Sequence, residues 1–229
     1  MGNQFKFYKD HARACDPKDY WGQVMRIAKG RTVGEDQIQM IVDSILTGLQ
    51  IGPDDVLLDL CCGNGALTDR IFAHCRGGLG VDFSPPLIEV AKRDFERPGE
   101  RDYVRYDAVS FAKQAEGGDR FTKAVCYAAF QCLAPDQAER LLALLWKRFP
   151  RVERLMLGNL PDKAKARQFL GRLYSPGIED DHSNSIGMWR TAEEFEALAK
   201  RTGWACSISR QPPEFFAASY RYDAVLTRL

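Results

Sequence analysis

The chain is poor in histidine and carries no excess of charge of either sign. It has 3 histidines, and its 32 basic and 31 acidic residues leave a formal net charge of +1. A nearly neutral chain gives no electrostatic reason to expect a nucleic-acid or anionic-membrane partner. No apolar run approaches the length of a membrane span, and the N-terminus lacks the apolar core of a signal peptide. We therefore expect a protein without a nucleic-acid or membrane partner.

The 7 cysteines show no paired spacing of the zinc-binding kind, so no metal site is expected. Cys61, Cys62 and Cys126 stand in apolar strand or strand-end patterns, which are typical of buried reduced thiols. This usage predicts a cytoplasmic location. A nucleophilic role is conceivable for Cys126 or Cys132, but a structural role is favoured because no histidine is near either residue in the sequence.

Two glycine-rich motifs of nucleotide-binding proteins are also missing. There is no phosphate loop of the form G-x-x-x-x-G-K-S/T, and the pair Gly63 and Gly65 lacks the third glycine of a dinucleotide-binding turn. Instead, the apolar run 56–60 contains Asp59 and leads into the glycine turn. Such a run predicts a buried parallel strand, and the glycines permit a sharp turn that a ligand can approach closely. A carboxylate beside this turn suits an ammonium group better than a phosphate.

Two further carboxylates follow predicted strands. Residues 79–82 read as a second strand that ends in Asp82, where an acid can accept hydrogen bonds from both hydroxyls of a ribose. Residues 103–108 read as a third strand that ends in Asp107. Three acids in succession, each after a strand and before a helical pattern, predict one ligand crevice at the ends of three strands.

The segment Asp59-Leu60-Cys61-Cys62-Gly63-Asn64-Gly65 resembles the first motif of the class I S-adenosylmethionine-dependent methyltransferases, D/E-x-G-x-G-x-G. Cys61 stands where the first glycine of that motif is usual. The resemblance implies S-adenosylmethionine as the cofactor, with Asp107 accepting from the adenine amine. The cofactor-binding residues expected are Asp59, Cys61, Gly63, Asn64, Gly65, Asp82, Phe83, Asp107, Ala108, Tyr127 and Gln131.

The rest of the chain continues the alternation of strand and helix patterns, which predicts the α/β class. Further strands are expected at residues 123–127, 152–158, 204–209 and 220–226. The resemblance implies a three-layer α/β/α sandwich with a seven-stranded, mostly parallel sheet of order 3-2-1-4-5-7-6, whose last strand is antiparallel. One domain, residues 1–229, is expected.

Two regions lie outside this core and are expected to determine the acceptor. Residues 1–52 form an N-terminal helical segment or lid, and residues 160–190 form an insertion that caps the substrate. Residues 53–159 make the cofactor-binding half between them, and residues 191–229 supply the last helix and strand pair. A capping box at Thr191 predicts the start of that helix.

The candidate catalytic residues are His182 and Tyr127. His182 has Asp180 and Asp181 beside it, which suits a general base, although a surface histidine in an acidic turn explains the pattern equally well. Tyr127 ends the fourth strand, where the resemblance implies contact with cofactor and substrate. The candidate substrate-binding residues, all from the N-terminal region, are Tyr20, Trp21, Arg26 and His11.

The residues after the fourth strand favour a small-molecule acceptor. Enzymes that methylate nucleobase amines carry a D/N/S-P-P-Y/F/W motif there, whereas this chain has Tyr127-Ala128-Ala129-Phe130. We expect methyl transfer to oxygen, or secondarily to nitrogen, by a monomer or homodimer. Two alternatives remain open: a non-catalytic scaffold that binds S-adenosylmethionine, and an NAD-type oxidoreductase, which the missing third glycine disfavours.

Overall fold

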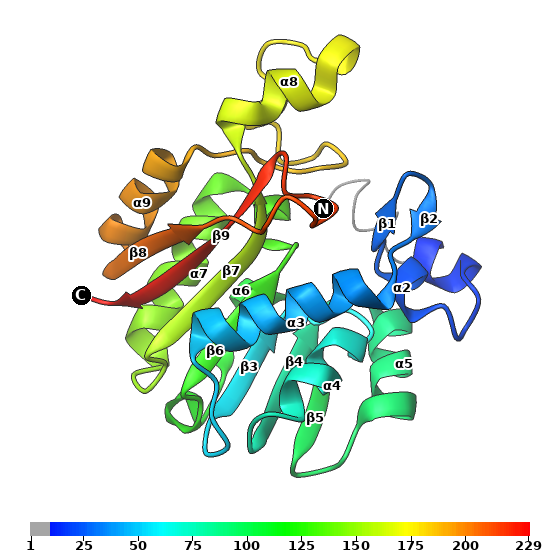
Figure 1. Cartoon of the computed structure of the whole chain (residues 1–229). Helices are drawn as coiled ribbons and strands as arrows, with labels where there is room; N and C mark the ends of the chain where they lie inside the picture. Colours follow the sequence, from blue (N-terminus) through cyan, green and yellow to red (C-terminus); the bar gives the residue numbers. More distant parts are fainter. Residues whose placement is uncertain (1–9) are drawn as a thin grey trace.

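The computed structural model describes residues 10–229, and a seven-stranded sheet with helices on both faces forms its centre (Figure 1). In chain order its strands are β3 (Val56–Leu60), β4 (Gly77–Asp82), β5 (Arg101–Arg105), β6 (Lys123–Tyr127), β7 (Arg154–Pro161), β8 (Trp204–Ser209) and β9 (Arg221–Arg228). Their order in space is β5-β4-β3-β6-β7-β9-β8, and only β9 runs antiparallel to its neighbours. The predicted fold class and strand order are confirmed.

Helices cover the two faces of the sheet in two groups (Figure 1). One group is α3 (Glu35–Leu49), α4 (Ala66–Phe72) and α5 (Pro85–Phe95), and the other is α6 (Ala108–Gln114), α7 (Pro135–Arg148) and α9 (Ala192–Arg201). Successive strand residues point to opposite faces. Leu57 of β3 therefore packs in the core under α3, while Leu58 packs in the core under α7. Burial on both faces explains why these strands are continuous apolar runs.

Several predicted boundaries differ from the structure for local reasons. The third strand ends at Arg105 and not at the predicted Asp107, because Asp107 caps helix α6 by accepting a hydrogen bond from the Ser110 N–H at 2.8 Å. The fifth strand extends to Pro161, since it keeps pairing with β9 beyond a bulge between Leu157 and Leu160. The capping box at Thr191 forms as predicted.

The N-terminal segment, residues 10–34, lies over the end of the sheet where the parallel strands finish (Figure 1). It contains a helical turn at residues 10–14, the short helix α2 (Tyr20–Gln23) and the two-stranded hairpin β1 (Ile27–Ala28) and β2 (Arg31–Thr32). The sequence predicts a helical segment here but not the hairpin.

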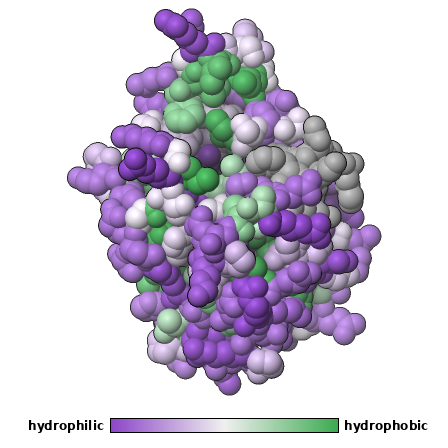
Figure 2. Space-filling view, turned by 90° about the vertical axis from the view of Figure 1, so that its right-hand side faces the viewer, coloured by the Kyte–Doolittle hydropathy of each residue, from purple (hydrophilic) through white to green (hydrophobic). Residues whose placement is uncertain are grey.

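The cap segment, residues 162–190, rises beyond the same end of the sheet after β7 (Figure 1). It consists of short turns of helix: η3 (Lys163–Lys165), α8 (Ala166–Leu170), η4 (Gly171–Leu173) and η5 (Ile178–Asp180). Figure 2 shows hydrophobic side chains gathered near the top of the molecule, and Phe169 and Leu173 of this segment are 44% and 77% exposed. Among the helices of residues 10–229, none has the length and hydrophobicity to cross a membrane.

Candidate functional site

A cavity of about 290 Å³ lies at the carboxyl ends of the parallel strands. Its walls come from the motif turn (residues 61–65), the ends of β4 and β6, the N-terminal segment, and the chain just before and at the start of β9. The predicted site residues that line the cavity are Trp21, Arg26, Asp59, Cys61, Gly63, Asn64, Asp82, Phe83, Asp107, Ala108, Tyr127 and Gln131. Four other predicted residues, Tyr20, His11, Gly65 and His182, do not line it.

Asp82 is fixed at the end of β4 by two backbone hydrogen bonds. Its Oδ2 accepts from the Gly63 N–H at 3.0 Å and its Oδ1 accepts from the Ser84 N–H at 2.8 Å. The side chain is buried, and burial raises its pKa to about 6. A carboxylate has about four lone-pair positions, so this one retains capacity for further donors such as sugar hydroxyls.

Asp59 is the second buried carboxylate of the cavity. Its Oδ2 accepts a hydrogen bond from the Thr68 hydroxyl at 2.6 Å. The pKa of Asp59 is raised to about 7, mainly by burial; the Thr68 hydrogen bond and the Arg26 charge lower this pKa, and the Asp82 charge raises it. Two buried carboxylates with raised pKa values favour a cationic ligand, since a positive charge stabilises their ionised forms.

The motif turn alternates left-handed and ordinary backbone conformations. Cys61, Gly63 and Gly65 have φ values of 61°, 60° and 80°. Glycine adopts such values without strain, which is why cysteine is unusual at the first position. The pKa of the Cys61 thiol is well above its ordinary value, because a hydrogen bond with the Cys126 thiol and burial both favour the protonated form. This thiol is therefore protonated at neutral pH and is a poor nucleophile.

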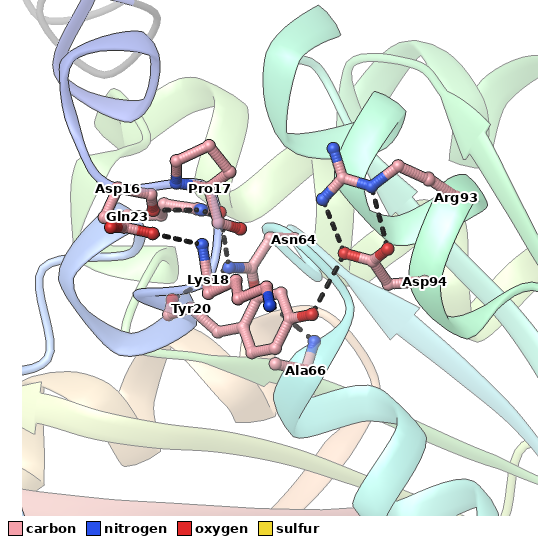
Figure 3. A network of polar contacts seen from close by, with 9 residues as sticks. All are labelled: Asp16, Pro17, Lys18, Tyr20, Gln23, Asn64, Ala66, Arg93 and Asp94. Atoms are coloured by element: carbon pink, nitrogen blue, oxygen red, sulfur yellow. Dashed lines mark hydrogen bonds and ion pairs between the residues drawn. The ribbon is translucent and has the colours of Figure 1, made fainter.

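Asn64 attaches the N-terminal segment to the motif turn (Figure 3). Its Nδ2 donates to the Tyr20 carbonyl at 2.8 Å and to Gln23 Oε1 at 2.9 Å, and its Oδ1 accepts from the Ala66 N–H at 3.3 Å. The side chain is 1% exposed. A Cβ added at Gly63 would lie 2.8 Å from Val24 Cγ1, so the segment also packs directly on the turn.

Tyr127 and Gln131 present unpaired polar atoms at the end of β6. The Tyr127 hydroxyl and Gln131 Oε1 are buried without a hydrogen-bond partner among the described residues. Gln131 is held by its Nε2, which donates to the Ala128 carbonyl at 2.9 Å. Burial raises the pKa of Tyr127, so its hydroxyl is neutral and can donate or accept a hydrogen bond. Unpaired buried polar atoms are costly, which favours a ligand that pairs with them.

Comparison with known proteins agrees with this geometry. Residues 57–148, from β3 through α7, match the family model described as a methyltransferase domain. This part of the chain is therefore similar to a methyltransferase domain. An uncharacterized methyltransferase of Schizosaccharomyces pombe is 33% identical over 76 residues, which are 33% of this chain and 27% of that protein. The match thus spans about a quarter of that curated relative.

Solved structures share the fold of this chain over a greater length than the family model. A magnesium protoporphyrin IX methyltransferase from Synechocystis, crystallised with S-adenosylhomocysteine, superposes with a TM-score of 0.66 at 15% identity, over 98% of this chain and 99% of that one. The small RNA methyltransferase HEN1 superposes with a TM-score of 0.62 at 18% identity, over 83% of this chain and 25% of that one. These likenesses concern the fold.

Three of the predicted site residues that do not line the cavity make other contacts. The Tyr20 hydroxyl donates to Asp94 Oδ2 at 3.1 Å, and its ring packs on Phe95 at 5.1 Å, so Tyr20 attaches the N-terminal segment to α5 (Figure 3). His11 Nε2 lies 2.9 Å from the Gly22 carbonyl within that segment. Gly65 is the N-cap residue of α4, and a Cβ added to it would lie 2.9 Å from the Tyr103 ring.

His182 lies in the cap segment, and residues Ser185 and Ile186 of the same loop line the cavity in its place.

Trp21 does line the cavity; its Nε1 donates to Glu35 at 3.1 Å and the Arg70 guanidinium lies 5.2 Å from its ring. Within residues 10–229, no group of three or more His, Cys, Asp or Glu side chains is placed to hold a metal ion.

Sequence reasoning did not identify several residues of the cavity wall. Asn159 lies at the β7 bulge with φ 61°, and its buried Oδ1 has no hydrogen-bond partner within residues 10–229. Arg221, the first residue of β9, donates from Nη1 to the Asn159 carbonyl. Phe216 and Tyr220 precede it in the cavity wall. The sequence carries no signal for the bulge that turns these residues toward the site.

Proposed function

We propose that the protein transfers a methyl group from S-adenosylmethionine to a small-molecule acceptor, with oxygen as the first acceptor atom and nitrogen as the second. The observation that carries the proposal is that Asp59, Asp82 and Asp107, at or just after the ends of three neighbouring strands, line one cavity. When bound, S-adenosylmethionine supplies a methyl group on a positively charged sulfur.

The residues present fit this cofactor. Asp82 retains lone pairs for the ribose hydroxyls after pairing with Gly63 and Ser84. Asp59 lies beside the glycine turn, where its raised pKa of about 7 favours a neighbouring ammonium or sulfonium charge. Asp107, which lines the same cavity, is assigned to the adenine amine.

The chain's own contribution is to position the reactants and exclude water. Methyl transfer is an in-line displacement, so alignment of the acceptor, the methyl carbon and the sulfur supplies much of the rate enhancement. The N-terminal segment, held by Asn64, covers the motif turn. Tyr127 and Gln131 lie at the end of β6, where unpaired oxygens can orient an acceptor. His182 does not line the cavity, so we assign it no part in proton transfer.

A small acceptor suits the dimensions of the site. The cavity of about 290 Å³ has to hold the cofactor as well as the acceptor, which favours an acceptor of small size. Among the solved structures of similar fold, one protein acts on a porphyrin and another on small RNA, so fold alone does not distinguish these acceptors. The proposal includes a monomer or homodimer in the cytoplasm, without a nucleic-acid or membrane partner.

Thermal unfolding in the presence of S-adenosylhomocysteine, S-adenosylmethionine and NAD tests the cofactor. We expect stabilisation by the first two ligands only. Asp82→Ala should weaken S-adenosylhomocysteine binding by about 1.5–3 kcal/mol, because the ribose hydroxyls lose a charged acceptor. The exposed Asp136→Ala on α7 is the matched control and should bind normally.

Two outcomes contradict this proposal. Stabilisation by NAD alone would indicate an oxidoreductase, and unchanged affinity of Asp82→Ala in calorimetry would remove Asp82 from the cofactor site. Transfer of a labelled methyl group to a panel of small acceptors then separates an enzyme from a binding scaffold, since a scaffold binds the cofactor but gives no product.

A further inference from the structure

The charged residues that line the cavity are divided by sign. The acids Asp59, Asp82 and Asp107 lie at or just after the ends of β3, β4 and β5. The two arginines come from other parts: Arg26 from the N-terminal segment and Arg221 from the start of β9. The cavity therefore has an acidic side, which suits the cationic cofactor, and a basic side.

Arg221 has no carboxylate partner among the residues that the structure describes. It makes no ion pair with any residue from 10 to 229, and its buried Nε has no acceptor among them. Its Nη1 donates to the Asn159 carbonyl, and its guanidinium lies 4.8 Å from the centre of the Tyr220 ring. Tyr220 in turn stacks on Phe169 at 3.7 Å, so the guanidinium is held in place on the cavity wall.

The positive charges of Arg26 and Arg221 influence Tyr127 at the end of β6, where the acceptor would lie. The Arg26 guanidinium is 5.0 Å from the centre of the Tyr127 ring, and both Arg26 and Arg221 act to lower the pKa of the Tyr127 hydroxyl, against the effect of burial. Arg26 also lowers the pKa of Asp59. Arg26 therefore faces the cofactor side as well, which leaves Arg221 as the cation that belongs to the acceptor side.

The remaining walls of this side are apolar and aromatic. Leu133, Ile186 and Phe216 line the cavity together with the Tyr127 ring, and no described lining residue outside the three strand-end acids carries a negative charge. A flat apolar body fits such walls. A guanidinium without a carboxylate in a half-buried site favours a planar anion, because its donors match the two oxygens of a carboxylate.

We propose that the acceptor is a small aromatic carboxylic acid whose carboxylate binds Arg221, and this rests on the proposed methyltransferase function. The aromatic ring packs against the apolar part of the wall, to which Phe216 and Ile186 belong, and the carboxylate pairs with the guanidinium. The ring then directs its nucleophilic substituent toward Tyr127 and the cofactor side of the cavity. Arg221 binds the acceptor and takes no part in cofactor binding.

Calorimetric titration of the protein saturated with S-adenosylhomocysteine tests this assignment. The probes are benzoate, 4-hydroxybenzoate, phenylacetate and 3-phenylpropanoate, each compared with its uncharged primary amide. We expect at least one acid to bind about tenfold to a hundredfold more tightly than its amide, as a charge-assisted pair with arginine requires. Arg221→Gln should remove this preference while S-adenosylhomocysteine affinity stays unchanged, and Arg221→Lys should restore part of it.

Arg201→Gln is the matched control, because Arg201 is exposed on α9 and pairs with Glu139 at 3.4 Å. It should behave as the wild type. Equal binding of every acid and its amide, or binding of none of the acids, overturns the proposal while leaving the cofactor assignment intact. A loss of S-adenosylhomocysteine affinity in Arg221→Gln also overturns it, since Arg221 would then support the cofactor site or the fold. If S-adenosylhomocysteine does not bind the wild type, the proposed function itself fails.

Discussion

The ligand-free protein should lose stability as the pH rises from about 5 to about 8, in contrast to most proteins with paired carboxylates. Asp82 and Asp59 are both buried, and their folded-state pKa values are about 6 and about 7, against an ordinary value of 3.8. A folded-state pKa above the unfolded value stabilises the protein below the unfolded pKa. That stabilisation is lost as the pH rises through the folded pKa.

The size of the effect follows from these values. One pKa unit corresponds to about 1.4 kcal/mol, so over this range Asp82 alone accounts for about 1 kcal/mol and Asp59 for about 3 kcal/mol. The Asp82 charge contributes to the raised pKa of Asp59, so the two values are not independent and about 3 kcal/mol is the expected total. Glu35 and Asp94 have lowered pKa values, so their contributions change only at more acidic pH.

Urea unfolding across this pH range measures the effect directly. Asp82→Asn should remove the part of the pH-dependent loss of stability that Asp82 contributes. Asp136 is an exposed acid, so Asp136→Asn should leave the pH dependence unchanged. With S-adenosylhomocysteine present the trend should reverse, because the ligand pairs with the ionised carboxylates and its affinity falls as the pH falls through about 7 to 6. A ligand-free stability that is flat or rises from pH 5 to 8 would refute the reasoning.

Two further predictions concern the segments that cover the cavity. Asn64→Ala should loosen the N-terminal segment by about 2–3 kcal/mol, since two buried hydrogen bonds to Tyr20 and Gln23 are lost. Faster amide exchange at Gln23 reports this, with the exposed Gln39→Ala on α3 as control, and unchanged exchange would show that the segment is held by packing alone. His182→Ala should leave turnover unchanged because His182 does not line the cavity; a large fall in kcat would return it to the candidate bases.

The positions of the strands could be predicted because their signals are local, whereas their order in the sheet was implied by the family resemblance. Continuous apolar runs mark strands buried on both faces, and Asp59 and Asp82 each end or nearly end such a run. Asp107 was placed beside the same cavity by the same reasoning, although it caps a helix instead of ending a strand. In each case the neighbouring residues alone were enough to locate the side chain.

The wall on the acceptor side could not be predicted, because it depends on contacts between distant segments. Asn64 was read as a cofactor contact from its motif position, whereas its amide also holds residues more than 40 positions earlier in the chain. Arg221 reaches the cavity through the bulge in β7 and its bond to Asn159, and neither has a sequence signal. His182 and Tyr20 were chosen for their chemistry, and packing places both elsewhere.

The reversed direction of β9 has a consequence for how the binding specificity of this protein can change. Strands β3, β4 and β5 each lead from the cavity into a helix of the core, α4, α5 and α6, so altering the ends of these strands also shifts a helix. β9 reaches the cavity at its first residue, directly after the irregular connection of residues 210–220. Insertions or substitutions in that connection can therefore reshape the acceptor wall while the motif turn and the helices keep their positions.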